Sequence, residues 1–214
     1  MVYSLEKYIL SSVNGGLIET VPSYSGLMVY YNPFEVSFEQ LSSTIESFIS
    51  GDQHPVTGNH RKVTIIPAFY GKEYGPDLET IASAKGLTGQ EVIDIHSSVD
   101  YRIYMLGFTP GFPYLGGMDE RIAYPRRSEP RLKIGAGSVG IAGSQTGIYP
   151  VESPGGWQII GRTPVRLFDP SGDKYFLLEP GDYLRFRPVS FEEYVAIHRT
   201  VTKGEYEPET SIIL

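Results

Sequence analysis

The chain of 214 residues contains no cysteine, so neither disulfides nor cysteine-bound zinc holds its fold together. It also lacks an apolar stretch of about 18 residues and a charged leader followed by an apolar segment, so we expect neither a membrane span nor export. The phosphate-binding loop ending in Gly-Lys-Ser/Thr and the Gly-x-Ser-x-Gly nucleophile elbow are both missing. A cytoplasmic location and no independent ATP site of that type are the resulting expectations.

Positive charge is scarce as well, with 18 Lys and Arg residues against 25 Asp and Glu residues and a formal net charge of -7. A general nucleic-acid binder needs a basic face, which this composition does not favour. Residues 77–97 resemble a helix-turn-helix, but the second helix would carry Glu91 and Asp94 without any Arg or Lys and would repel phosphates. We therefore expect no nucleic-acid partner.

The chain is rich, by contrast, in Gly, Pro, Arg and aromatic residues between Gly107 and Pro164. Fourteen of its 24 glycines lie between Gly107 and Gly181, so the backbone there turns repeatedly through angles that only glycine adopts cheaply. This density is typical of a binding or catalytic site rather than of a linker. Three spaced glycines at 135–140 match the dinucleotide-binding pattern, but the residues that follow cannot form the helix which that site requires.

Apolar spacing divides the chain into two parts, of which the first is residues 1–75. Helical periodicity from Leu5 to Val13 predicts one helix, and a capping box of Ser37 and Gln40 predicts the start of a second. Strands are expected at 18–21, 26–31 and 63–70. This first part is predicted to be a small α+β domain, with residues 70–76 as the junction to the next.

The second part, residues 76–214, is predicted to be a β-barrel domain that begins with two short helices. Asp77 caps the first helix, and Thr88 with Glu91 forms a capping box for the second. From Tyr101 onward, short apolar segments recur about every eight to twelve residues between Gly and Pro, which is typical of a barrel or a sandwich. The strands expected here are 101–107, 138–142, 158–161, 165–168 and 183–187. The predicted fold class of the whole chain is α+β.

Three arginines, Arg126, Arg127 and Arg131, form a cluster of positive charge in an otherwise acidic chain. Pro125 and Pro130 keep this segment stiff, and planar guanidinium groups suit the recognition of a carboxylate or a phosphate. A solvated loop with ordinary surface ion pairs explains the same residues equally well. Both interpretations stay open at the level of sequence.

Other candidate site residues surround the arginines in the sequence. The expected walls of a pocket are five aromatic residues, with two Gly-Gly steps that let the backbone approach a ligand: Phe108, Phe112, Tyr114, Tyr149, Trp157, Gly116 with Gly117, and Gly155 with Gly156. A barrel core of aromatic residues with glycine corners is the structural alternative. His96 ends a predicted helix just before the run and is a further candidate, although the helix dipole alone accounts for a histidine there. No metal site is expected from the spacing of the histidines.

At these residues the sequence resembles a known family. Three strings carry the resemblance: Gly107-Phe-Thr-Pro-Gly-Phe-Pro-Tyr-Leu115, Pro125-Arg-Arg127 with Pro130-Arg131, and Ser153-Pro-Gly-Gly-Trp-Gln-Ile-Ile-Gly-Arg-Thr-Pro164. Tyr149-Pro150 accompanies the third string. The strings are similar to the first subunit of the allophanate hydrolase/5-oxoprolinase family. That family includes the B subunit of bacterial 5-oxoprolinase, a sensor-kinase inhibitor of sporulation and part of the carboxyltransferase region of urea carboxylase. The resemblance covers nearly the whole chain, including Tyr70-Gly71 with Gly75-Pro76-Asp77-Leu78 and His96-Ser97.

The resemblance implies a small N-terminal α/β sandwich domain followed by a cyclophilin-like β-barrel domain, without prolyl isomerase activity. It also implies an ATP-hydrolysing 5-oxoprolinase, which opens 5-oxo-L-proline to L-glutamate together with partner subunits A and C. ATP would bind to the complex, whereas this chain alone would bind no cofactor and be inactive. Under this resemblance, the positive groups and donors that catalysis needs are supplied by Arg126, Arg127, Arg131, Arg162, Gln145 and Tyr149.

Two other functions of the family stay open. One is the inhibition of a sensor histidine kinase by protein binding, for which the aromatic run would form an exposed apolar patch. The other is a part of an allophanate hydrolase or of a biotin-dependent urea carboxyltransferase, with biotin carried by another subunit.

Overall fold

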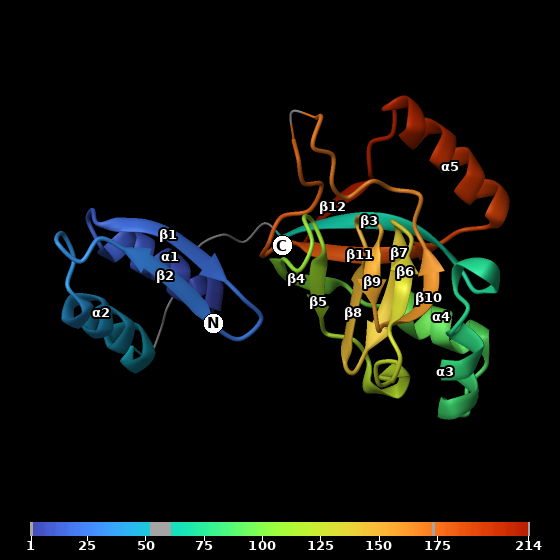
Figure 1. Ribbon diagram of the computed structural model, residues 1–214, viewed down its shortest axis with the longest axis horizontal. Coiled ribbons are helices and arrows are strands. Elements are labelled where there is room, and N and C mark those ends of the chain that lie inside the picture. Colours follow the sequence, from blue (N-terminus) through green and yellow to red (C-terminus); the bar gives the residue numbers. More distant parts are fainter. Residues whose placement is uncertain (1, 52–60, 173, 214) are drawn as a thin grey trace. The chain divides into compact units, whose positions relative to one another are not determined.

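The computed structural model describes residues 2–51, 61–172 and 174–213, and the chain divides into two compact units, Met1–Asn59 and His60–Leu214 (Figure 1). This division lies earlier than the expected one after residue 75. The reason is strand β3 (Arg61–Tyr70), which pairs with strands of the second unit: it is parallel to β11 (Tyr183–Pro188) and antiparallel to β12 (Thr210–Ile213).

The first unit consists of two helices and one antiparallel hairpin: α1 (Val2–Ser12), β1 (Leu17–Pro22), β2 (Leu27–Tyr31) and α2 (Phe38–Ser50). The predicted capping box is confirmed, since the Ser37 side chain accepts from the Gln40 backbone and the Gln40 side chain accepts from the Ser37 backbone. Ile9, Val36 and Leu41 form the buried centre of this unit. The predicted α+β character is confirmed.

The second unit is built on a closed barrel of seven strands. Their order around the barrel is β10, β7, β8, β5, β4, β11 and β3, and β3 closes the circle by pairing with β10. The strands not yet given bounds are β4 (Tyr101–Leu106), β5 (Pro113–Gly116), β7 (Ser138–Ala142), β8 (Gln145–Ile148) and β10 (Gln158–Arg162). All neighbours are antiparallel except β3 and β11. The predicted β-barrel is confirmed.

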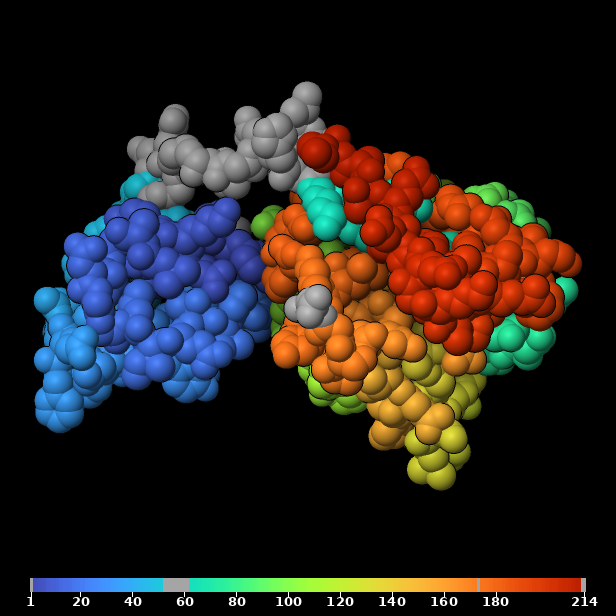
Figure 2. Space-filling view, turned by 90° about the horizontal axis from the view of Figure 1, so that it is seen from above, coloured from blue at the N-terminus to red at the C-terminus, as the bar shows by residue number. Residues whose placement is uncertain are grey.

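Short helices and a second ribbon surround this barrel (Figure 1). They are η1 (Lys72–Tyr74), α3 (Leu78–Lys85), α4 (Gly89–Ser97), η2 (Glu120–Ile122), the antiparallel pair β6 (Arg131–Ile134) and β9 (Ser153–Gly155), and α5 (Phe191–Lys203). The capping box of Thr88 and Glu91 is present at the start of α4. Figure 2 shows the C-terminal segment, coloured red, covering one face of this unit.

Strands β7 and β10 are buried on both sides, because each separates two hydrophobic clusters. Side chains alternate across a strand, so Val139, Ile141 and Ile160 point into the barrel, where they join the main core. Ala142 and Ile159 instead belong to a cluster on the outer side of the wall. The β6–β9 ribbon lies over that outer side, and Ile134 of β6 packs into the same cluster.

Two segments differ from the sequence expectations. Residues 165–168 do not form a strand: Val165 and Leu167 are buried in the main core, but only Phe168 makes a single bridge, to Phe176. Residues 70–76 form no open junction either, because Gly75 packs so closely on β10 that a Cβ there would lie 2.0 Å from the carbonyl oxygen of Ile160. Among the residues with a described placement, no helix is long and apolar enough to span a bilayer.

Candidate functional site

The outer cluster of the barrel consists of six buried residues, Phe112, Ile134, Ala142, Tyr149, Trp157 and Ile159, with Tyr114 packed against them. The Phe112 ring lies at its centre, with ring centroids 5.1 Å from Tyr114, 5.2 Å from Tyr149 and 5.3 Å from Trp157. Two of these contacts are edge-to-face, which is the favoured geometry for aromatic pairs. Four of the five predicted aromatic residues, Phe112, Tyr114, Tyr149 and Trp157, therefore meet in one place.

Two glycines leave the space in which these rings pack. A Cβ on Gly147 of β8 would lie 3.0 Å from the Phe112 ring, and a Cβ on Gly155 of β9 would lie 2.3 Å from the Tyr149 hydroxyl oxygen. A side chain at either position would push the ring away. Gly155 thus serves packing inside the protein. Gly156 accepts a hydrogen bond of 2.8 Å from the Arg127 backbone and so anchors the arginine segment.

Residues 125–131, which we call the arginine loop, are fixed by one carboxylate, that of Asp77. Arg131 donates to both of its oxygens, at 2.9 Å to Oδ2 and 2.8 Å to Oδ1, and Arg127 approaches Oδ1 at 3.3 Å. The Ile159 backbone N–H donates to Oδ2 at 2.6 Å. Asp77 is buried, whereas Arg131 and Arg127 are partly exposed. Two of the three predicted arginines therefore already have a carboxylate partner within the chain.

Arg126 differs from its two neighbours. Its guanidinium carbon lies 5.9 Å from the centre of the Trp157 ring, a distance at which a cation is attracted to the face of an indole. Within residues 2–51, 61–172 and 174–213, the Arg126 side chain makes no ion pair with a carboxylate; Glu129, in the same loop, is not bound to it either. Arg126 is exposed and its donors face solvent.

Tyr149 lies near this guanidinium as a protonated donor. Burial raises the pKa of its hydroxyl, against a hydrogen bond from the Trp157 backbone and the charge of Arg126 that lower it. The phenol therefore keeps its proton at neutral pH. Tyr149 and Trp157 are buried, with 1% and 6% of their surface exposed, so Arg126 is the accessible group of the three.

Two hydroxyl oxygens near the outer cluster have no hydrogen-bond partner in the described part of the chain. They belong to Thr109, three residues before Phe112, and to Ser153, two residues before Gly155. An unpartnered buried hydroxyl costs free energy. Phe108, next to Thr109, has a positive φ of 67° and a side chain that is 66% exposed, while its ring still contacts Phe112 at 5.9 Å. The loop is held in a strained shape beside the cluster.

His96 lies elsewhere, inside the barrel. Its ring packs on Phe186 at 4.5 Å; Nε2 lies 2.8 Å from the Thr146 hydroxyl and Nδ1 2.8 Å from the Tyr70 hydroxyl. Thr146 donates to the carbonyl oxygen of Gly140, so Nε2 carries the proton and Tyr70 donates to Nδ1. Burial lowers the pKa of His96 to about 3, which keeps the ring neutral.

Two further candidates, Arg162 and Gln145, lie on strands β10 and β8 rather than on the arginine loop. Arg162 donates to the carbonyl oxygen of Ala136 at 2.7 Å, and its guanidinium carbon lies 5.8 Å from the Tyr74 ring centre. Gln145 begins β8 opposite Ala142, and within the described residues its side chain makes no hydrogen bond. No described interaction joins either residue to Arg126, so both stay predictions from the resemblance alone.

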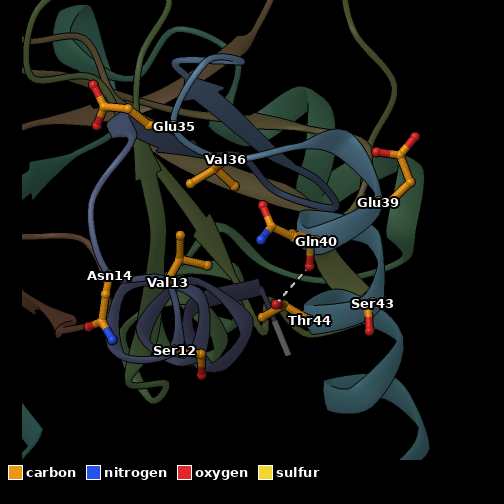
Figure 3. A pocket seen from close by; sticks show the side chains of 9 residues that line it. All are labelled: Ser12, Val13, Asn14, Glu35, Val36, Glu39, Gln40, Ser43 and Thr44. Carbon is orange, nitrogen blue, oxygen red and sulfur yellow. Dashed lines mark hydrogen bonds between the residues drawn. The ribbon is translucent and has the colours of Figure 1, made fainter.

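A hollow of the first unit lies between the end of α1 and the start of α2 (Figure 3). Val13 and Val36 point toward each other at its centre, and the Thr44 hydroxyl donates to the backbone of Gln40. Three of the polar side chains around it take part in local hydrogen bonds: Gln40 in the capping box of α2, Thr44, and Glu35, which accepts from Asn32. This hollow has no cation and no aromatic wall, so the outer cluster is the better candidate site.

Comparison with known proteins decides the family. Residues 1–178 match the sequence model described as "Carboxyltransferase domain, subdomain C and D". The chain is 44% identical over 206 residues to the B subunit of 5-oxoprolinase from Bacillus subtilis (strain 168), a match that covers 92% of this chain and 85% of that protein. The chain belongs to this carboxyltransferase-domain family. The resemblance stated from the sequence is confirmed.

Two solved structures of similar proteins extend the comparison. The crystal structure of PH0987, a conserved uncharacterized protein from Pyrococcus horikoshii, is 49% identical, with a TM-score of 0.60 over 90% of this chain and 88% of that chain. The crystal structure of TTHA0988 is 37% identical, with a TM-score of 0.74 over 88% of this chain. This chain spans 37% of the TTHA0988 chain, so family members also occur within longer polypeptides.

The sequence did not reveal the residue that fixes the arginine loop. Asp77 is expected from the sequence only as a helix cap, and it does occupy the N-cap position of α3, but its side chain makes no capping hydrogen bond. It reaches instead to arginines 50 and 54 residues further along the chain. A signal was present, because Asp77 falls in a string, Gly75 to Leu78, that belongs to the resemblance.

Proposed function

We propose that this chain is the B subunit of an ATP-dependent 5-oxoprolinase and acts with subunits A and C. Support comes from the 44% identity to a protein of that name, which extends over 92% of this chain. The subunit designation implies a complex with other chains. The hydrolytic reaction, its use of ATP and the identity of the partner subunits are parts of this proposal.

The observation that carries the proposal is the unpaired guanidinium of Arg126 over Trp157. The substrate 5-oxo-L-proline is a small ring with one carboxylate, so it needs one cation and one flat apolar surface. Arg126 pairs with the carboxylate, whereas the aromatic rings beneath it are buried and hold it in place, so the apolar surface for the ring comes from a partner subunit. Tyr149 supports the Trp157 ring from within, with 6.5 Å between the ring centroids.

The reaction needs activation, because opening an unstrained lactam is uphill near neutrality. ATP transfers its terminal phosphoryl group to the lactam oxygen, and water then attacks the carbonyl carbon. The bond between carbon and ring nitrogen breaks and the nitrogen takes a proton, which leaves an acyl phosphate. A second water then hydrolyses this acyl phosphate to the carboxylate and free phosphate. The products are L-glutamate, ADP and phosphate, and fixed positive charge stabilises the transition states of these steps.

This chain by itself does not supply all the groups that the reaction requires. The outer cluster contains neither a general base nor a nucleophile, and the neutral His96 is enclosed in the barrel with both ring nitrogens engaged. We therefore infer that the active site is shared, with the nucleotide and the proton-transfer groups on partner subunits. The exposed side of Arg126 is where a partner would complete the site.

The test is reconstitution of the complex from this chain with subunits A and C, followed by an assay of ATP-dependent glutamate release from 5-oxo-L-proline. The proposal predicts turnover only when this chain is present and none from this chain alone. Full turnover by A and C without this chain would contradict it, as would robust turnover by this chain in isolation.

A second candidate function is carboxyl transfer, which the description of the matching family favours. It predicts dependence on a biotin carrier and on bicarbonate, which the same reconstitution measures by omitting each in turn.

For sensor-kinase inhibition the structure offers less support. Phe112, Tyr149 and Trp157 are buried, and of the aromatic residues beside Arg126 only Phe108 is largely exposed, so the run forms no broad apolar patch.

A further inference from the structure

The carboxylate of Asp77 holds the arginine loop and the start of β10 together. Its four donors are the two Nη atoms of Arg131, one Nη of Arg127 and the backbone N–H of Ile159. The Asp77 backbone N–H in turn donates to the carbonyl oxygen of Ile159 at 2.9 Å. Trp157 lies two residues before Ile159. One side chain thus sets both the arginines and the aromatic ring on which Arg126 lies.

The same contacts divide the three arginines into two kinds. Both Nη atoms of Arg131 donate to Asp77. Arg127 donates to the same carboxylate through one Nη, and its Nε donates to the carbonyl oxygen of Glu129 at 3.4 Å. A guanidinium bound in this way has fewer donors for a ligand, and its charge is partly balanced. Of the three arginines, only Arg126 has a guanidinium with no hydrogen bond or ion pair to another described residue.

We infer that Asp77 is a specificity-determining residue of this site: by occupying Arg131 and Arg127 it leaves one guanidinium for the ligand and restricts the site to a single carboxylate. This inference rests on the proposed function for the substrate class. Without Asp77 the loop would present three guanidinium groups, of which two would be released. Such a loop would favour ligands with two negative charges over ligands with one.

Tryptophan fluorescence can report ligand binding at Arg126, because Trp157 is the only tryptophan of the chain and its ring lies under Arg126. Binding of an anion to Arg126 changes the surroundings of the indole and hence its fluorescence. We would titrate the full chain with acetate, which carries one charge, and with malonate, which carries two at about pH 8, at constant ionic strength.

The wild-type chain is expected to bind both anions through Arg126, so Arg126→Ala abolishes the fluorescence response. Asp77→Asn is expected to raise the affinity for malonate relative to acetate by about tenfold, which corresponds to one additional favourable charge contact. In the double variant Asp77→Asn with Arg126→Ala, malonate binding persists through the released arginines. Near-UV circular dichroism of each variant checks that the fold is retained.

The matched control is Asp100→Asn. Asp100 also accepts a two-pronged pair from an arginine, Arg185, at 2.6 and 2.7 Å, but it lies at the start of β4 rather than at the outer cluster. This variant makes the same change in net charge and is expected to leave the ratio of malonate to acetate affinity unchanged. A response of Asp100→Asn equal to that of Asp77→Asn would overturn the inference.

If Asp77→Asn fails to fold, Arg131→Gln tests the inference from the other side. It removes one cation but keeps Asp77, so the affinity for malonate relative to acetate is expected to fall. The inference is overturned if a folded Asp77→Asn or Arg131→Gln variant leaves the ratio unchanged, or if neither anion alters the fluorescence of the wild-type chain. These outcomes are independent of enzyme turnover, so the failure of the inference and that of the proposed reaction are distinguishable.

Discussion

Inside the barrel, both nitrogens of the His96 ring have partners, whereas on the outer wall the arginine loop leaves one guanidinium without a carboxylate among the described residues. Both regions gather aromatic and polar side chains, and sequence reasoning named residues from each as site candidates. The difference lies in how their hydrogen bonds are used. A closed network stabilises the fold, whereas an unused donor beside an aromatic face is available to a ligand.

The largest expected effect on stability concerns the Asp77 pair. Arg131→Ala leaves the buried carboxylate of Asp77 without its two-pronged partner, so we expect a loss of about 3 kcal/mol in the free energy of unfolding. Urea denaturation measures it. The matched control is Arg121→Ala, which removes an exposed pair with Asp119 and is expected to leave the free energy of unfolding nearly unchanged. Equal losses in the two variants would mean that Asp77 does not fix the arginine loop.

The second effect is a dependence of stability on pH that comes from the barrel interior. The folded-state pKa of His96 is about 3, below the unfolded value of 6.5, so protons bind preferentially to the unfolded chain as the pH falls. The stabilisation is present above about pH 6.5 and is lost toward pH 3. Between about pH 7.5 and 5 the free energy of unfolding should fall by about 2 kcal/mol through this group.

His96→Gln is expected to remove that part of the pH dependence, which urea denaturation at several pH values measures. His198→Gln, at an exposed position of α5, serves as the matched control and should leave the slope as in the wild type. A slope that changes equally in both variants would contradict the closed, neutral network around His96.

The third effect is the removal of one member of that network. Tyr70→Phe leaves Nδ1 of His96 without its donor, and we expect a loss of about 1.5 kcal/mol in the free energy of unfolding. Tyr175→Phe, at an exposed position, should change it by less than about 0.5 kcal/mol. Indistinguishable thermal or urea midpoints for the two variants would show that the hydrogen bond from Tyr70 contributes nothing.

The helices and strands were largely predictable where residues close together in the sequence determine them. The capping boxes at Ser37 and Thr88 and the strand at 138–142 were all predicted from neighbouring residues. The ribbon of β6 and β9 was missed, because its strands are short, contain Pro154 and pair across a gap of about twenty residues. The C-terminal α5 was not predicted either, although Ser190 caps it.

The site was predictable in its residue types but not in its pairings. The strings of the sequence pointed to Arg126, Tyr149 and Trp157, which the structure brings together. They did not reveal that Asp77 takes Arg131 and Arg127, because that contact joins residues 50 or more positions apart. Local patterns record capping and periodicity, whereas a buried ion pair between distant segments leaves no local trace.

The smallest expected effect concerns Arg162, which the structure places on Tyr74 and the backbone of Ala136. Arg162→Ala should change kcat/KM of the reconstituted complex by less than about threefold, since Arg162 lies on β10 rather than on the arginine loop. The measurement is the glutamate-release assay. If Arg162→Ala lowered kcat/KM as much as Arg126→Ala does, Arg162 would also belong to the site, which would then extend along β10.

The most direct test of the central claim is one pair of numbers for Arg126→Ala: kcat/KM for 5-oxo-L-proline in the reconstituted complex and the free energy of unfolding of the variant chain. The account predicts that kcat/KM falls by about a hundredfold while the free energy of unfolding changes by less than about 0.5 kcal/mol. Unchanged turnover would contradict it. So would a fall in turnover explained by an equally large loss of stability, since Arg126 would then hold the fold rather than the ligand.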